Sequence, residues 1–431
     1  MTTSKRILII GNGGAAMHAV QAARGAGYEG EIHVVSDVRG PAFNPMLSPY
    51  YLAGKIPFDR CYPFGDAFYE THQVIRHFGF KAEALDPANR KCFLTSRQGI
   101  HYDLCLVATG ASPVMPPVSG LADCRHALVL RTAEQAKHLD LILPKVRRVV
   151  ILGASLVGIK LAETLSARGI DVMLVDVAGH VLPHVAHPDC AALIQNHLRE
   201  CHVKLRLNRD LKGAEDVGKG IRLYFQDQES LDTDLCLVCT GIRANLDLLE
   251  ETDVKRNRGV LVDHHMQTSA PALYAAGDVS QGMNLLSGEK EVIALWGNAC
   301  SQGRTAGLSM AGRKSFYLGS VPQYVSTFFG MTFISMGDTS RKGDHIEISS
   351  CEDAARGCCR VLLLERGILI GFNAVNCFHE IGYIKAVISQ RLTWQRPQGS
   401  GIDHPFWLRE KVTPGCCAVS CRRVTPVSSR S

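Results

Sequence analysis

The stretch Arg6-Ile7-Leu8-Ile9-Ile10-Gly11-Asn12-Gly13-Gly14-Ala15-Ala16 decides the fold of this chain. Its apolar run predicts a buried strand, and the residues after the glycines predict a helix. Glycines at such a turn permit a tight bend and a close backbone approach. A pyrophosphate can then bind to free N–H groups at the positive end of the helix dipole. We therefore expect Gly11, Gly13, Gly14, Ala15 and Ala16 to form a dinucleotide cradle.

The same pattern returns roughly 140 residues later, as Arg148-Val149-Val150-Ile151-Leu152-Gly153-Ala154-Ser155-Leu156-Val157-Gly158. A second strand, turn and helix are predicted here. The expected cradle residues are Gly153, Ser155, Leu156, Val157 and Gly158. Ser155 takes the place of the middle glycine, and its hydroxyl either donates a hydrogen bond to the pyrophosphate or is tolerated by a slightly wider turn.

An acidic residue follows the next predicted strand in both units. Glu31-Ile32-His33-Val34-Val35-Ser36 ends at Asp37, and Asp171-Val172-Met173-Leu174-Val175 ends at Asp176. A carboxylate at this position accepts hydrogen bonds from an adenosine ribose. Two complete fingerprints predict two dinucleotide sites. The alternative interpretation is a pair of α/β units whose glycines serve packing alone.

Length and composition set the class of protein. A chain of 431 residues predicts two or three domains. The 47 basic and 41 acidic residues give a net charge of +6 without a basic block, which argues against nucleic acid and suits an acidic electron carrier. No leader and no membrane-spanning apolar run is seen, and the 16 cysteines are spread along the chain. We expect a cytoplasmic protein with buried thiols.

The rest of the chain repeats the first pattern. Tyr102–Val107 predicts a buried strand that ends at Ala108-Thr109-Gly110, and Asp234–Val238 leads in the same way to Cys239-Thr240-Gly241. Ala272–Ala276 predicts a short strand that ends at Gly277-Asp278, and Trp296–Met310 predicts a helix. From Gly319 onward, short β-type segments and a helix around Ile381–Gln390 predict a smaller β-rich domain.

Five motifs in combination resemble the two-dinucleotide flavoprotein reductases, which include ferredoxin and rubredoxin reductases and the apoptosis-inducing-factor group. The motifs are the two glycine turns, Ala108-Thr109-Gly110, Cys239-Thr240-Gly241 and Tyr274-Ala275-Ala276-Gly277-Asp278. The resemblance covers residues 5–392. It implies an α/β fold with two Rossmann-like domains and a small C-terminal α+β interface domain. The implied boundaries are 1–118 and 245–318 for a discontinuous FAD domain, 119–244 for the inserted NAD(P)H domain, 319–395 for the interface domain and 396–431 for a tail, expected to be poorly packed.

The resemblance also implies roles for single residues. Asp278 would bind the ribityl or pyrophosphate part of FAD, and Trp296 would meet the flavin ring, although it could also be a core aromatic. The implied FAD set comprises Gly11, Gly13, Gly14, Ala15, Ala16, Asp37, Asn44, Ser48, Ala108, Thr109, Gly110, Gly277, Asp278 and Trp296. The NADH set comprises Gly153, Ser155, Leu156, Val157, Gly158, Asp176, Thr240 and Gly241. Thr109 and Thr240 more simply close strand-to-loop turns.

The chain departs from the family at three points. The loop Asn44-Pro45-Met46-Leu47-Ser48-Pro49 has no cysteine, which disfavours a dithiol relay. Where ferredoxin reductases commonly have a lysine near flavin N5, this chain has Pro49, and where the family has the partner glutamate it has Lys160. We therefore treat Lys160 as the candidate catalytic residue, a cation near the flavin and nicotinamide, with a solvent-facing helix lysine as the alternative. Cys358, Cys359, Cys416, Cys417 and Cys421 do not have the spacing of a metal site and are interpreted as adventitious thiols.

The nucleotide and the function follow from these residues. Asp176 and the absence of arginine in Val177-Ala178-Gly179-His180 favour NADH over NADPH. We expect an FAD-dependent NADH oxidoreductase, monomeric or homodimeric. It would pass electrons to a ferredoxin- or rubredoxin-type iron–sulfur carrier, as the reductase component of an oxygenase or another multicomponent redox system. Two alternatives stay open: an NADH oxidase or small-molecule (quinone) reductase, and an NADH-responsive interaction subunit.

Overall fold

The computed structural model describes residues 5–353, 356–377, 381–394 and 420–423. The chain divides into two compact units. Unit 1 comprises residues 1–114, 130–144 and 241–320, and unit 2 comprises residues 115–129, 145–240 and 321–431. Each unit contains one of the two glycine-rich turns.

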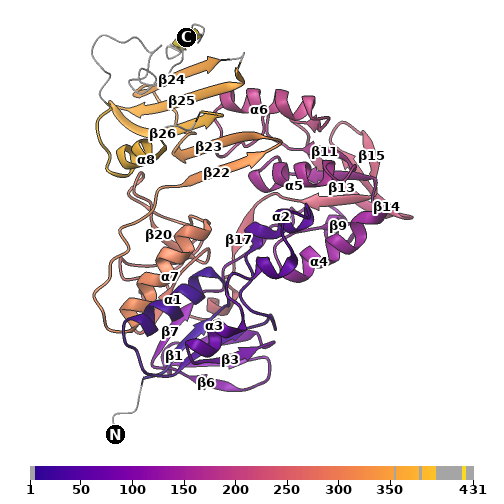
Figure 1. Cartoon of the computed structure of the whole chain (residues 1–431). Coiled ribbons are helices and arrows are strands. Elements are labelled where there is room, and N and C mark those ends of the chain that lie inside the picture. The colour runs from indigo at the N-terminus through magenta and orange to yellow at the C-terminus, as the bar shows by residue number, and fades with distance from the viewer. Residues whose placement is uncertain (1–4, 354–355, 378–380, 395–419, 424–431) are drawn as a thin grey trace. The chain divides into compact units, whose positions relative to one another are not determined.

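Unit 1 is built on a five-stranded parallel sheet of order β19-β7-β1-β2-β3 (Figure 1). The central strand β1 is wholly buried, and its Ile7 is in register with Ile32 of β2 and with Leu104 of β7. Burial on both faces explains why this strand is an uninterrupted apolar run. The strands of the sheet are β1 (Ile7–Ile10), β2 (Ile32–Ser36), β3 (Val74–Phe78), β7 (Leu104–Val107) and β19 (Leu273–Ala275).

Two helices lie side by side in this unit: α1 (Gly14–Gly25), which follows the first glycine turn, and α7 (Trp296–Met310) (Figure 1). Their backbones nearly touch. A Cβ atom on Gly303 would come within 2.1 Å of the Ala15 carbonyl oxygen, and one on Gly307 within 2.2 Å of the Ala19 oxygen. These glycines let α7, which is remote in sequence, pack directly on the start of α1.

The remaining elements of unit 1 surround this core. They are α2 (Ser48–Leu52), α3 (Asp66–Thr71), α4 (Ala133–Ile142), β4 (Ala82–Asp86), β5 (Lys91–Leu94), β6 (Gly99–His101), β8 (Ala111–Pro113), β17 (Ile242–Ala244), β18 (Val260–Leu261), β20 (Ser280–Met283), β21 (Lys290–Glu291) and the 3₁₀ turns η1 (Pro45–Leu47), η2 (Phe58–Cys61) and η5 (Asp247–Leu249).

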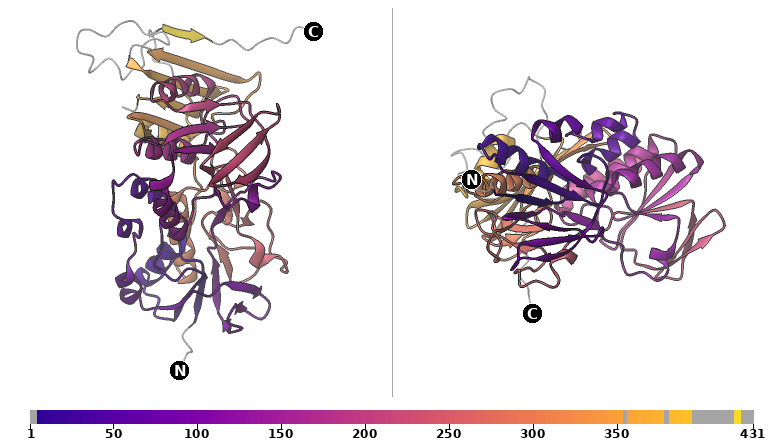
Figure 2. Two further views of the ribbon diagram at one scale, coloured as in Figure 1. Left: turned by 90° about the vertical axis from the view of Figure 1, so that its right-hand side faces the viewer. Right: turned by 90° about the horizontal axis from the view of Figure 1, so that it is seen from below.

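Unit 2 contains a second parallel sheet, of order β12-β11-β10-β16-β9, and a six-stranded antiparallel sheet near the C-terminus. The parallel sheet consists of β9 (Ala127–Leu128), β10 (Arg148–Leu152), β11 (Asp171–Val175), β12 (Lys204–Arg206) and β16 (Leu235–Val238), with α5 (Leu156–Ser166) and α6 (Pro188–Glu200). The antiparallel sheet consists of β22 (Gln323–Phe328), β23 (Met331–Gly337), β24 (Ile346–Asp353), β25 (Cys358–Glu365), β26 (Ile368–Val375) and β27 (Ser420–Arg423), with α8 (Ile381–Ser389) (Figure 2).

The α/β class, the two Rossmann-like sheets and the small C-terminal α+β part are confirmed. Two antiparallel three-stranded sheets were not predicted. One is β4-β5-β6, and the other consists of β13 (Leu211–Val217), β14 (Gly220–Phe225) and β15 (Ser230–Thr233). Within the predicted tail, β27 pairs with β24. Cys416 and Cys417, like the rest of the tail, lie outside the described residues. Residues 130–144 belong to unit 1, where α4 contacts α2.

A stacked pair of histidines lies within the first sheet. His33 of β2 and His77 of β3 approach to 2.9 Å between ring nitrogens, and the other His33 nitrogen lies 3.2 Å from the Glu31 carboxylate, which also pairs with Arg6. Burial lowers the pKa of both histidines; for His77, the neighbouring His33 and Arg6 lower it further. Both rings are therefore held neutral in the folded protein at pH values where the unfolded chain binds protons.

This pair predicts a pH dependence of stability. Because the folded pKa values are lowered, stability is present above the ordinary histidine pKa of about 6.5 and is lost as the pH falls through that value. We expect the unfolding midpoint to fall between pH 7 and pH 5, and a His77→Gln variant to show a flatter fall. Thermal unfolding at several pH values checks this, with His184→Gln, at an exposed histidine, as the matched control. Equal slopes for His77→Gln and the natural chain would refute it.

Candidate functional site

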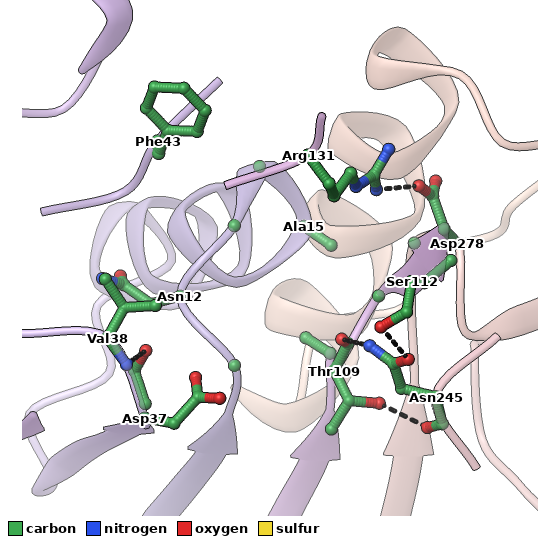
Figure 3. Close-up of a pocket in the computed structure, with 18 of the residues that line it drawn as sticks. Asn12, Ala15, Asp37, Val38, Phe43, Thr109, Ser112, Arg131, Asn245 and Asp278 are labelled. Atoms are coloured by element: carbon green, nitrogen blue, oxygen red, sulfur yellow. Dashed lines mark hydrogen bonds and ion pairs between the residues drawn. The ribbon is translucent and has the colours of Figure 1, made fainter. Parts of the chain in front are cut away.

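A cavity of about 450 Å³ opens in unit 1 at the carboxyl ends of β1, β2, β7 and β19. Parallel strands direct ligands to this edge of a sheet. Many of the predicted FAD residues line the cavity: Gly11, Gly13, Gly14, Ala15, Asp37, Ala108, Thr109, Gly110, Gly277, Asp278 and Trp296. Segments that are far apart in sequence therefore meet around one space (Figure 3).

Gly11, Gly13 and Gly14 of the first turn each lack a side chain for a different structural reason. Gly11 has a φ of +116°, and a Cβ atom there would lie 2.1 Å from the Ala108 carbonyl oxygen. A Cβ on Gly14 would lie 3.1 Å from the indole of Trp296. Gly13, at the N-cap of α1, has an ordinary negative φ, and a Cβ there would meet no protein atom within 4 Å. Gly13 thus faces open space beside the helix N-terminus, which is where a pyrophosphate fits.

Three predicted FAD residues do not line the cavity. Ala16 is fully buried within unit 1. The Asn44 side chain accepts a hydrogen bond from Met46 N at 3.0 Å and caps the turn η1. Ser48 is fully buried, and its hydroxyl has no hydrogen-bond partner among the described residues. The structure therefore gives Asn44 a local capping role and Ala16 a packing role.

Arg131 is a cavity residue that the sequence analysis missed. Its guanidinium donates to the Asp278 carboxylate at 2.7 Å, and the two side chains are 29% and 14% exposed (Figure 3). Arg131 immediately precedes α4, where Thr132 and Gln135 form a capping box, and Arg131 N donates to Gln135 Oε1. The Thr-x-x-Gln pattern could have located this helix start, but only the fold brings Arg131 to Asp278.

Other missed cavity residues fasten the glycine turn and the Ala108–Gly110 segment. Asn12 donates to Gly40 O at 3.1 Å and accepts from the Tyr69 hydroxyl at 2.7 Å. Asn245 donates to Thr109 O at 2.8 Å, and its backbone carbonyl accepts from the Thr109 hydroxyl at 2.9 Å (Figure 3). The Thr109 hydroxyl is thus used in closing a turn. Further lining residues that were not predicted include Lys81, Phe43, Glu134 and Asp247.

The charges and thiols around the cavity determine what chemistry it allows. The described lining carries two cationic side chains, Lys81 and Arg131, and four carboxylates, Asp37, Asp278, Glu134 and Asp247. Cations suit a pyrophosphate, and carboxylates accept hydrogen bonds from hydroxyl groups. Among the lining residues that the structure describes, there is no cysteine. Cys61 and Cys300 elsewhere in unit 1 have thiol pKa values raised by burial, to about 11 for Cys300. The residues fit FAD, and the cavity offers no thiolate.

The second glycine turn, in unit 2, closes against the end of β16. Gly153 has a φ of +103°, and a Cβ there would lie 2.5 Å from Cys239 O. A Cβ on Gly158 would lie 2.1 Å from Gly153 O. Ser155 is the N-cap of α5: its hydroxyl accepts from Gly158 N at 3.3 Å and donates to Cys239 O at 3.1 Å. The hydroxyl therefore holds the turn together.

Of the other predicted nucleotide residues, Leu156, Val157, Asp176 and Thr240 belong to unit 2 with this turn, and Gly241 belongs to unit 1. Leu156 and Val157 begin α5, and Val157 is 43% exposed. Thr240 ends the unit 2 segment that contains β16, and Gly241, with a φ of +119°, begins the next segment of unit 1. The Asp176 carboxylate accepts from Ala154 N at 2.7 Å and from Ala178 N at 2.8 Å, one bond on each oxygen. Each oxygen keeps a lone pair for a ribose hydroxyl.

Lys160 is not a solvent-facing lysine. Its ammonium group donates to the Glu163 carboxylate and to Thr327 O, both at 2.6 Å, and its side chain is 12% exposed. The alternative interpretation from the sequence is thus wrong. Glu163, one turn further along α5, supplies a carboxylate partner that the sequence analysis did not consider.

Comparisons with known proteins show the family to which the chain belongs. The family described as pyridine nucleotide-disulphide oxidoreductase matches residues 5–303. The chain is 30% identical over 388 residues to the NADH-dependent phenylglyoxylate dehydrogenase subunit epsilon of Aromatoleum evansii, covering 90% of this chain and 92% of that protein. It is 29% identical over 322 residues to an NADH oxidase of Methanocaldococcus jannaschii, covering 71% and 70%. The reductase in a covalent putidaredoxin reductase–putidaredoxin complex superposes with a TM-score of 0.83 at 25% identity, covering 91% and 94%.

Proposed function

This chain belongs to the pyridine nucleotide-disulphide oxidoreductase family and is an FAD-dependent NAD(P)H oxidoreductase, and from this premise we propose that it exchanges electrons between NADH and an iron–sulfur protein. The observation that carries the proposal is that none of the described residues lining the cavity is a cysteine. Electrons that cannot pass to a thiol pair beside the flavin must leave directly for an external acceptor.

The chain's own residues would bind and orient FAD and the nicotinamide nucleotide and shield them from solvent. Gly13 and the start of α1 would offer N–H groups to the FAD pyrophosphate, and Arg131 and Asp278 would offer a cation and a hydrogen-bond acceptor to FAD. Gly153, Ser155 and Asp176 would hold the nicotinamide nucleotide. When bound, FAD supplies the exchange between two-electron hydride transfer and one-electron transfer. The protein contributes positioning and electrostatics.

Two relatives support the choice of acceptor. The Aromatoleum evansii relative is a subunit of an NADH-dependent dehydrogenase, and the structural neighbour is a reductase captured with putidaredoxin. We therefore place this chain as the nucleotide-oxidising or nucleotide-reducing subunit of a multicomponent redox system, with a ferredoxin- or rubredoxin-type carrier. The described cysteines from Cys61 to Cys377 are free thiols, which supports a reducing, cytoplasmic setting. No helix among the described residues is long and apolar enough to cross a bilayer.

The acceptor is tested by reoxidation of the NADH-reduced protein in a stopped-flow instrument. We expect ferredoxin or rubredoxin to reoxidise it much faster than air does, and a pull-down to recover a small iron–sulfur protein. The similarity to an NADH oxidase favours dioxygen as the second candidate acceptor. Reoxidation by air that no iron–sulfur carrier accelerates would establish that candidate and overturn the first.

NADH rather than NADPH is the proposed nucleotide, because the arginines nearest Asp176 already have partners. Arg206 and Arg209 exchange backbone hydrogen bonds with Asp176 at 3.0 Å, but their guanidinium groups pair with Glu229 and Asp227. These carboxylates compete with a 2′-phosphate for the two guanidinium groups, and the Asp176 carboxylate repels a 2′-phosphate.

An Asp176→Ala variant tests the nucleotide preference. We expect the ratio of kcat/KM for NADH to that for NADPH to fall by about 10- to 100-fold, the worth of hydrogen bonds to a charged group. Steady-state kinetics with both nucleotides measures this ratio. Asp171→Ala, at the other end of β11 where Asp171 pairs with Lys204, is the matched control and should leave the ratio unchanged. An unaltered ratio in Asp176→Ala would exclude the assignment.

Lys160 remains our candidate for a cation that tunes the flavin. Because its charge is shared with Glu163, two opposite substitutions give a sharper test than one. We expect Lys160→Glu to lower the flavin potential and slow hydride acceptance, and Glu163→Gln to raise the potential, each by on the order of 30 mV. Spectroelectrochemical titration and anaerobic stopped-flow reduction measure the two effects. Potentials and rates that stay unchanged in both variants would remove Lys160 from this role.

A further inference from the structure

Two buried cysteines of unit 2 lie in direct contact. Cys190, in the first turn of α6, and Cys359, on β25, are separated by 169 residues, yet their sulfur atoms are 3.4 Å apart. They are 0% and 1% exposed. Figure 1 shows α6 beside the C-terminal sheet, and α6 contacts both β25 and β26. The sequence analysis interpreted Cys359 as adventitious because nothing in its spacing indicated this partner.

The thiol pair lies beside a set of hydrogen bonds that already joins the start of α6 to the sheet. The Asn373 side chain of β26 is fully buried; its oxygen accepts from His187 N at 2.5 Å, and its nitrogen donates to Val185 O at 3.0 Å. The Thr339 hydroxyl donates to the same Val185 oxygen at 3.1 Å. These bonds fix the backbone just before Cys190, so the two sulfurs face each other in a stiff setting.

We propose that Cys190 and Cys359 are a modification site: on exposure to hydrogen peroxide they form a disulfide that fastens α6 to the C-terminal sheet. An S–S bond is about 2.05 Å long, so the sulfurs must approach by roughly 1.4 Å from 3.4 Å. Small side-chain rotations and shifts supply a movement of this size, because the sulfurs are already in contact.

The reaction balances with peroxide as the oxidant. One thiolate attacks a peroxide oxygen, which gives a sulfenic acid and one water after protonation. The second thiol displaces the sulfenic oxygen as another water and forms the S–S bond. The two thiols lose two electrons and two protons, and one peroxide becomes two waters. The product is the disulfide, without further oxidation of either sulfur.

The rate at which peroxide oxidises Cys190 and Cys359 depends on the surroundings of the two thiols. The hydrogen bond to Cys359, together with burial, holds the pKa of the Cys190 thiol well above its ordinary value. The resting pair is therefore a protonated dithiol, and access for peroxide requires local opening of the α6–β25 contact. We expect oxidation over minutes to hours rather than seconds. Because the bond replaces an existing contact, NADH reduction of the flavin should keep its rate within about twofold.

Peptide mapping of the full-length holoprotein tests the site directly. The protein is treated with hydrogen peroxide, denatured in an alkylating reagent, digested and analysed by mass spectrometry. We expect a Cys190–Cys359 linked peptide that dithiothreitol removes, and an unfolding midpoint several degrees higher in the oxidised protein. Cys190 and Cys359 that both remain open to alkylation after prolonged treatment, or that are recovered as sulfinic acids, overturn the proposal.

Three serine variants test whether the disulfide forms specifically between Cys190 and Cys359. Cys190→Ser and Cys359→Ser should each lose both the linked peptide and the gain in midpoint. Cys358→Ser is the matched control, because the neighbouring Cys358 sulfur instead lies 3.5 Å from the carbonyl oxygens of Arg356 and Asn376. The control should retain both signals. A gain in midpoint that survives in Cys190→Ser, or a link that Cys358→Ser abolishes, assigns the chemistry to other cysteines.

Discussion

A Gly13→Val variant will fold normally but will be purified without FAD. A Cβ atom at this position meets no protein atom within 4 Å, and the negative φ of Gly13 suits any residue. The added atoms instead fill the space at the N-terminus of α1 that a pyrophosphate needs. We expect FAD affinity to fall by at least about 100-fold, which corresponds to about 3 kcal/mol. Reconstitution of the apoprotein, followed by flavin fluorescence, measures the loss.

The matched control for this variant is Gly25→Val at the other end of α1, where a Cβ atom also meets no protein atom within 4 Å. It should bind FAD as the natural chain does. Thermal unfolding of the two apoproteins should agree within about 1 kcal/mol, the usual worth of a change at a helix end. FAD bound with natural affinity by Gly13→Val would show that the pyrophosphate lies elsewhere.

An Arg131→Ala variant should also lose FAD affinity, by about 10- to 100-fold. The substitution removes a cation from the cavity and leaves the Asp278 carboxylate, whose side chain is 14% exposed, without its 2.7 Å partner. An unpaired carboxylate there repels the anionic cofactor. Titration of the apoprotein with FAD, by calorimetry, gives the affinity directly.

A second substitution distinguishes repulsion of FAD by the unpaired Asp278 carboxylate from loss of the attraction that Arg131 provides. Asp278→Asn in the Arg131→Ala background removes the uncompensated charge, so it should restore part of the affinity. A double-mutant cycle then gives a coupling of about 1–2 kcal/mol. Arg131→Lys keeps the charge without the planar guanidinium and should be intermediate. Full affinity in Arg131→Ala, or no coupling in the cycle, contradicts a role for this ion pair in holding FAD.

The central strands, the glycine turns and the helix Trp296–Met310 could be predicted because their signals are local. An apolar strand that leads into a glycine turn fixes the βαβ unit, and the observed bounds of β10 and α7 are those predicted. The strands β4, β5 and β15 were missed because they are short and partly exposed. The strand β14 carried a signal that was overlooked, since buried Ile221, Leu223 and Phe225 alternate with more exposed side chains.

The candidate site was only partly predictable, because its missing members arrive from distant segments. Arg131 reaches Asp278 through the placement of α4, and the role of Trp296 against Gly14 depends on the close contact of α1 with α7. The capping bonds of Ser155 and the pairing of Lys160 with Glu163 depend on side-chain directions that spacing alone does not reveal.

Anaerobic titration of the purified, FAD-reconstituted protein with NADH tests the central claim most directly. We predict that the visible absorption of the flavin is bleached in proportion to added NADH until about one equivalent has been consumed, because the flavin accepts a two-electron hydride. A protein that binds FAD but keeps its full absorption with an excess of NADH and of NADPH would contradict the assignment of the two glycine turns to a flavin and its nicotinamide donor.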